Sequence, residues 1–145
     1  MNEKSTKFGV VKKIVLATFS EGAKLAKSGI VCISAIGKPY DAEKQKFSDY
    51  FTIEGIQTNY AMFLHGIRVK DYKAAYMLYL ESLNKVGKEV YIETIDAICD
   101  DENTDTIAFI GSGYVHSFDY RWILADYFKD CGVRIYHYSY RDWET

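Results

Sequence analysis

The chain has 145 residues, the length of one ordinary domain, and its 48% hydrophobic and 26% charged content excludes a disordered chain. The net charge of -2 excludes the basic excess that is typical of general nucleic-acid binders. No run of 18 apolar residues occurs, so we expect a cytoplasmic protein and no membrane partner. Residues 1–145 are predicted to form a single α/β domain, with residues 1–7 as a disordered polar tail.

The cysteines indicate a reduced protein. Cys32, Cys99 and Cys131 lie far apart and form no C-x-x-C pair, and the three histidines show no metal-ligand spacing. Free cysteine is among the most buried residue types. We therefore predict three reduced thiols, most of them in the core, and we expect no disulfide, no metal and no cofactor.

The first third of the chain alternates strand and helix signals. Residues 9–17 (GVVKKIVLA) are a β-branched run of strand length, and residues 18–22 follow as a predicted loop. A short helix is predicted at 23–27, and a second continuous apolar strand at 30–36 ends in the turn Gly37-Lys38-Pro39-Tyr40. Runs of this kind favour strands that are covered on both faces, as in parallel sheets.

The middle of the chain is predicted to be helical. Residues 41–59 give a weak pattern, interpreted as a long loop with a short helix at 47–51, and 60–65 as a further helical turn. The clearest helix runs from Asp71, a suitable N-cap, to Val86, with Gly87 after its end. Its apolar arc is wide, which predicts packing on two sides.

The last third gives two more strands and two helices. Residues 89–99 fit both a strand and a helix, and the longer helical pattern favours the helix. A buried strand is predicted at 106–110 (TIAFI), a helix capped by Ser117 at 118–131, and a last strand at 133–138 (VRIYHY). Strands separated by helices predict a single Rossmann-like, three-layer domain with a mainly parallel sheet of about four or five strands.

Ligands of such sheets bind beyond the carboxyl ends of the strands. That rule selects residues 18–20, 34–39, 111–121 and 139–141, and it predicts that Thr18, Lys38, Gly111 and Tyr138 lie at one edge. The strongest signal is the glycine-bearing turn 111–117 (GSGYVHS), whose backbone N–H groups and helix N-terminus favour an anion. The alternative is an ordinary tight turn from strand to helix.

The candidate site residues follow from this edge. The ligand-binding candidates are Thr18, Ser20, Lys38, Gly111, Ser112, Gly113, Ser117 and Arg121. The only candidates for acid–base catalysis are Asp119 and His116. Arg121 can bind a phosphate or carboxylate with two N–H groups, and the alternative is a surface arginine paired with Asp126 or Glu144.

Tyrosines alternate on the last strand. Tyr136, Tyr138 and Tyr140 share one face and could stack on a base, or they could pack against a helix instead.

Five segments between residues 14 and 138 resemble a known family: 17–20 (ATFS), 31–34 (VCIS), 37–39 (GKP), the Tyr-rich helix 72–83, and 118–128 (FDYRWILADYF). The chain resembles the family called domain of unknown function 488, small bacterial and archaeal α/β proteins. The resemblance implies a Rossmann-like fold. The family's Phe-Cys-His-Arg segment reads Phe118-Asp119-Tyr120-Arg121 here, so the resemblance implies that thiol chemistry is absent.

Together these observations predict a cytoplasmic domain that binds a small anionic ligand, a nucleotide or nucleoside phosphate, at the carboxyl edge of its sheet. The alternative is a non-catalytic interaction module that binds a protein partner through a Tyr-rich surface.

Overall fold

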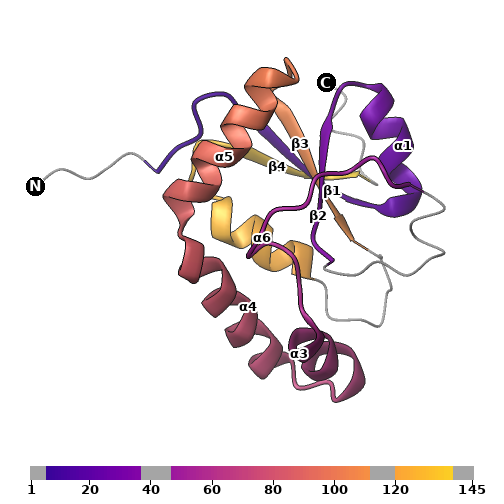
Figure 1. Ribbon diagram of the computed structural model, residues 1–145, viewed down its shortest axis with the longest axis vertical. Coiled ribbons are helices and arrows are strands. Elements are labelled where there is room, and N and C mark those ends of the chain that lie inside the picture. The colour runs from indigo at the N-terminus through magenta and orange to yellow at the C-terminus, as the bar shows by residue number, and fades with distance from the viewer. Residues whose placement is uncertain (1–5, 37–46, 112–119, 139–145) are drawn as a thin grey trace, which may run out of the picture.

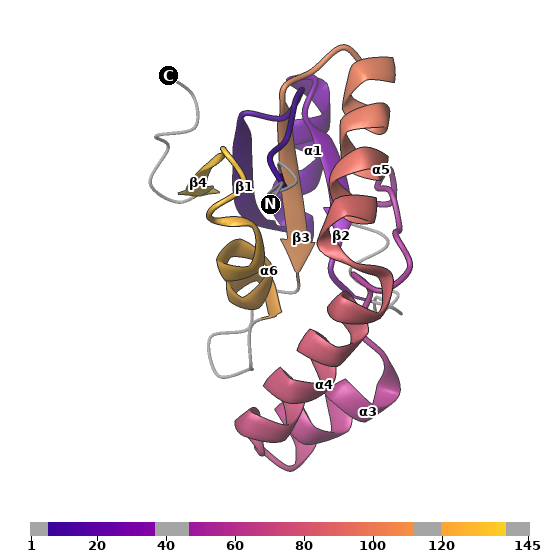
Figure 2. The same cartoon turned by 90° about the vertical axis from the view of Figure 1, so that its left-hand side faces the viewer.

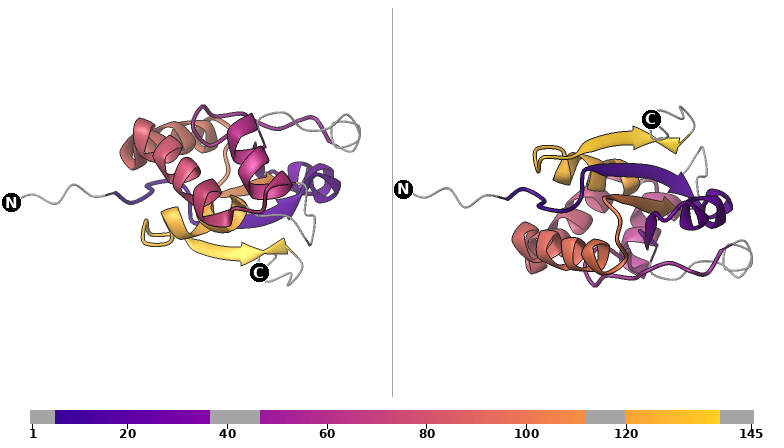
Figure 3. Two further views of the ribbon diagram at one scale, coloured as in Figure 1. Left: turned by 90° about the horizontal axis from the view of Figure 1, so that it is seen from below. Right: turned by 90° about the horizontal axis from the view of Figure 1, so that it is seen from above.

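The computed structural model of the protein describes residues 6–36, 47–111 and 120–138 (Figure 1). Within these residues one sheet has the strand order β2-β3-β1-β4, and every pairing is parallel. Its strands are β1 (Lys13–Thr18), β2 (Val31–Ser34), β3 (Thr106–Gly111) and β4 (Arg134–His137). Figure 3 shows β4 beside β1 with both arrowheads pointing the same way. The predicted single α/β, Rossmann-like domain with a parallel sheet is confirmed.

Helices cover both faces of this sheet. The helices of the described residues are α1 (Phe19–Lys27), α3 (Tyr60–Phe63), the π-helix η1 (Leu64–Arg68), α4 (Tyr72–Val86), α5 (Lys88–Asp101) and α6 (Tyr120–Phe128). Ile14 and Leu16 of β1 enter the core cluster that contains residues of α4, α5 and α6. Val15 and Ala17 enter the cluster that contains residues of α1. Figure 2 accordingly shows α5 and α6 in front of the sheet and α1 behind it, which explains the apolar strands.

The helix boundaries of α4 and α5 match the predicted ones closely. The Asp71 carboxylate accepts the N–H of Ala74 at 3.1 Å, and Gly87 separates the two helices at a φ of 101°. The helical choice for 89–99 is confirmed. Helix α4 contacts α3 and η1 as well as α5 and α6, and Figure 1 shows it extending beyond the sheet. Its fully buried residues are Ala75, Tyr79 and Leu83, while Met77 is 56% exposed.

Two local predictions fail because of specific contacts. The predicted loop 18–22 is the start of α1, whose first turn is closed by the N–H of Thr18 donating to the Glu21 carboxylate at 2.9 Å. The helix predicted at 47–51 is absent, since no residue of this segment is helical. Phe51 instead bridges Ile33 beside β2. The predicted turn at 60–65 is helical, as α3 and the beginning of η1.

Two fully buried tyrosines provide a matched stability test. The hydroxyl of Tyr79 donates to the carbonyl of Ile56 at 2.6 Å, whereas the Tyr91 hydroxyl is buried without a hydrogen-bond partner among the described residues. Replacing Tyr79 by Phe should lower the free energy of unfolding by about 1–3 kcal/mol, since the Ile56 carbonyl stays buried and unpaired. Tyr91→Phe should leave it unchanged or raise it by up to about 1 kcal/mol. Urea denaturation measures both; equal losses would contradict this assignment of the hydroxyls.

The three cysteines are free and buried, as predicted. Burial, aided by nearby carboxylates, raises the pKa of both Cys32 and Cys99 from 9.0 to about 12. Above pH 9 the unfolded chain therefore loses thiol protons that the folded chain keeps. This stabilisation is complete below pH 9 and is lost as the pH rises toward 12.

We expect the free energy of unfolding to fall between pH 9 and pH 10, by about 1 kcal/mol for each of these two thiols. Urea denaturation of Cys32→Ala at pH 8, 9 and 10 should show a decrease about 1 kcal/mol smaller than that of the wild type. The two proteins are compared by this decrease, because the substitution also changes stability at neutral pH. An identical decrease in both would show that Cys32 titrates normally in the fold.

Candidate anion site at the carboxyl edge of the sheet

The two central strands end side by side. Thr18 of β1 is the register partner of Gly111 of β3. After β1 the chain continues into α1, and α1 covers one face on the way to β2. The connection from β3 to β4 contains α6, which covers the opposite face. Adjacent strands whose connections leave in this way form a topological switch point, where ligands of open α/β sheets bind.

Arg121 lies at this switch point, in the first turn of α6, and only 6% of the residue is exposed. Its Nη1 group donates a hydrogen bond to the carbonyl oxygen of Ala17, the residue before the end of β1. The side chain passes over Gly111, where a Cβ would lie 3.0 Å from the Arg121 Cδ. The absence of a side chain at the end of β3 therefore gives the arginine its room.

The burial of Arg121 corrects the alternative of a solvated arginine. Asp126, its predicted surface partner, pairs with Lys129 at 2.9 Å instead, and Glu144 lies outside the described residues. Truncation of Arg121 should therefore also weaken the fold. Removing a buried charged donor from the Ala17 carbonyl costs about 1.5–3 kcal/mol of stability.

The N-terminus of α1 reaches the same edge but already holds an anionic group. The Glu21 carboxylate accepts the N–H of Thr18, the N-cap of α1. Thr18 is half-buried and Ser20 is exposed. A ligand phosphate beside α1 would meet this negative charge, so the α6 side of the edge is the more favourable anion position.

Of the predicted site residues, Thr18, Ser20, Gly111 and Arg121 are described. The structure brings Gly111 together with Thr18 by strand register and with Arg121 by side-chain contact. The remaining candidates lie outside the described residues: Lys38, Ser112, Gly113, His116, Ser117 and Asp119.

The aromatic residues of the edge are arranged differently from the predicted tyrosine ladder. Tyr136 and Tyr138 pack against the core cluster of the α1 face, which favours the packing interpretation for both; Tyr140 lies outside the described residues. Trp122, which was not among the predicted site residues, is 57% exposed and stacks on His137. The signal available in the sequence was a tryptophan outside the apolar stripe of its helix.

Tyr120 is held in a structural role at the start of α6. Its hydroxyl donates to the carbonyl oxygen of Met62, and its ring packs edge-on against Tyr79. Burial raises the pKa of Tyr120 to about 12, so the phenol stays protonated at neutral pH.

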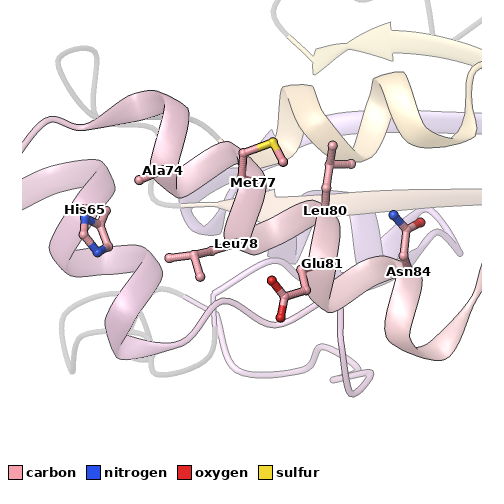
Figure 4. A pocket seen from close by; sticks show the side chains of 7 residues that line it. All are labelled: His65, Ala74, Met77, Leu78, Leu80, Glu81 and Asn84. Atoms are coloured by element: carbon pink, nitrogen blue, oxygen red, sulfur yellow. The ribbon is translucent and has the colours of Figure 1, made fainter.

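A separate groove lies away from this edge, between η1 and α4 (Figure 4). Its volume is about 590 Å³, and His65 faces the α4 residues across it. The lining residues are His65, Ala74, Met77, Leu78, Leu80, Glu81 and Asn84. Val69 and Tyr72 are exposed apolar side chains near the start of α4. The groove shares no lining residue with the switch point.

No family model, curated protein or solved structure matches the chain, so the resemblance to domain of unknown function 488 stays a prediction. In the part of the chain that the structure describes, no three His, Cys, Asp or Glu side chains group to hold a metal ion. The same residues contain no helix that is long and apolar enough to cross a membrane.

Proposed function

We propose that this domain binds a small anionic ligand, a nucleotide or nucleoside phosphate, at the carboxyl edge of its sheet. The observation that carries the proposal is the coincidence of a buried guanidinium, that of Arg121, with the topological switch point between β1 and β3. A buried arginine is costly unless it is hydrogen-bonded, and here it is held where ligands of this fold class bind.

The chemistry of the edge suits a phosphate. A guanidinium has five N–H donors in a planar fork that matches phosphate oxygens, and α6 adds the partial positive charge of its N-terminus. In this proposal the binding site is completed by the other predicted residues of the edge, which are Thr18, Ser20, Lys38, Gly111, Ser112, Gly113 and Ser117. Asp119 and His116 are the only residues proposed for acid–base catalysis, should the bound ligand react.

The test is thermal unfolding of the wild type and of Arg121→Lys with nucleotides and sugar phosphates. A ligand present at about 100 times its dissociation constant should stabilise the wild type by roughly 2.7 kcal/mol. Lysine keeps the positive charge but lacks the paired N–H donors of the guanidinium. The affinity of Arg121→Lys for the ligand should therefore be about ten- to a hundred-fold weaker than that of the wild type. Lys129→Ala removes an exposed cation near the end of α6 and should bind as the wild type does.

Two results would contradict the proposal. One is that no nucleotide or sugar phosphate stabilises the wild type. The other is that Arg121→Lys, still folded by circular dichroism, binds such a ligand as tightly as the wild type.

The second candidate function is a protein-interaction module, and the apolar surface between η1 and α4 favours it. Met77, which lines the groove of about 590 Å³, is 56% exposed. Such a groove suits the apolar face of an amphipathic partner helix. A protein partner that binds the wild type should not bind Met77→Asp, which puts a charge in the groove. The control is Glu93→Lys, a change on the exposed face of α5, which should bind the partner as the wild type does.

A further inference from the structure

We infer that the ligand carries an aromatic base that stacks on Trp122, which makes it a nucleotide rather than a sugar phosphate or free phosphate. This inference rests on the proposed anion site. Trp122 follows Arg121 directly in the first turn of α6, and it is 57% exposed although its neighbours Arg121 and Ile123 are buried.

The indole of Trp122 packs on the last residue of β4. Its ring lies 6.1 Å from the ring of His137, centroid to centroid, at an interplanar angle of 29°. His137 is the last residue of β4 and the register partner of Leu16, so the stack lies at the carboxyl edge of the sheet. Helix α6 and β4 are neighbours on that side (Figure 2). An exposed indole at this place offers a planar ring a surface on which to stack.

Arg121 and the stacked Trp122 provide separate binding positions for the phosphate and the base of the ligand. The Arg121 guanidinium reaches the carbonyl of Ala17 between the central strands, while Trp122 reaches outward to β4. A phosphate bound to Arg121 and a base stacked on Trp122 would lie along the same edge of the sheet. Aromatic stacking accepts every base, because each has a π-face, so the platform selects nucleotides as a class without choosing the base.

The experiment uses the full chain with Trp143→Phe, which leaves Trp122 as the only tryptophan and its fluorescence as the signal. The probes are the four ribonucleoside 5′-monophosphates and ribose 5-phosphate, which has the same phosphate and no base. At least one nucleotide should quench Trp122 and bind about 5- to 150-fold tighter than ribose 5-phosphate. Trp122→Ala should bind that nucleotide only as tightly as ribose 5-phosphate, whose own affinity should not change.

The outcomes separate this inference from the function on which it rests. If ribose 5-phosphate and the nucleotides bind equally, by calorimetry, and Trp122 is not quenched, stacking is wrong and the anion site stands. If none of the probes binds, the proposed function fails. If Trp122→Ala keeps the full preference for the nucleotide, the base is recognised elsewhere. Thermal melts check that Trp122→Ala is folded, as expected for a side chain this exposed.

Discussion

Replacing Asp96 by alanine is expected to lower the free energy of unfolding by about 3–5 kcal/mol, because three charge-assisted hydrogen bonds are lost. The Asp96 carboxylate lies on α5 and accepts three successive backbone N–H groups. Oδ2 accepts that of Gly9 at 2.8 Å, and Oδ1 accepts those of Val10 and Val11 at 3.0 Å each. These contacts fasten the segment before β1 to a helix 85 to 87 residues away.

Asparagine at position 96 tests the acceptor requirement at constant volume. Its amide keeps one acceptor oxygen and turns an N–H donor toward a backbone N–H, so we expect a loss of about 2–4 kcal/mol. Glu93→Gln removes the same charge from an exposed position on α5 and should change stability by less than about 0.5 kcal/mol. Urea denaturation measures all three variants.

Hydrogen exchange gives the second measurement for Asp96. The amides of Gly9, Val10 and Val11 should lose protection in Asp96→Asn before the strand amides of β1 do. If Asp96→Asn is as stable as Glu93→Gln, the segment before β1 is held by something other than this carboxylate.

The same contacts explain why the first strand was predicted four residues too long. Residues 9–17 have a strand pattern throughout, yet β1 begins at Lys13. The N–H groups of residues 9–11 bond to Asp96, so they are not available to a sheet ladder. Periodicity reports which side chains become buried, and it does not report where a backbone N–H finds its acceptor.

Where local signals were sufficient, the prediction was accurate. Helix α4 begins after Asp71 and ends before Gly87, as the capping chemistry of these residues predicts. The four strands were predicted from their apolar runs. The start of α1 was also readable, since Thr18 and Glu21 have the spacing of a capping box, but the segment was interpreted as a loop.

The candidate site was less predictable, because burial at the edge depends on distant contacts. Arg121 is buried because Gly111 leaves room for its side chain and Ala17 supplies a carbonyl, neither of which is near in sequence. Trp122 has a partner 15 residues away, and its neighbour in sequence faces the interior. The sequence therefore predicted that Thr18 and Gly111 end side by side, while the burial and contacts of Arg121 and Trp122 required the three-dimensional arrangement.

Gly55→Ala is expected to cost about 2–5 kcal/mol, from a strained backbone and a collision added together. Gly55 has a φ of 91°, in the left-handed region, where an L side chain costs about 1–2 kcal/mol. A Cβ built there would lie 2.0 Å from the hydroxyl oxygen of Tyr91, a fully buried side chain. Displacing a buried group to admit a methyl costs about 1–3 kcal/mol more.

Two further variants separate the backbone strain at Gly55 from the collision. Gly29 also has a positive φ, 82°, but a Cβ there meets nothing within 4 Å, so Gly29→Ala should show the backbone cost alone. Tyr91→Phe removes the colliding oxygen, so Gly55→Ala made in that background should lose only about 1–2 kcal/mol. The double-mutant cycle in urea should therefore give a coupling of about 1–3 kcal/mol between positions 55 and 91. If the two substitutions have additive effects on the free energy of unfolding, the Tyr91 ring moves aside at no cost. The packing of α5 on the segment around Gly55 would then not fix the position of this ring.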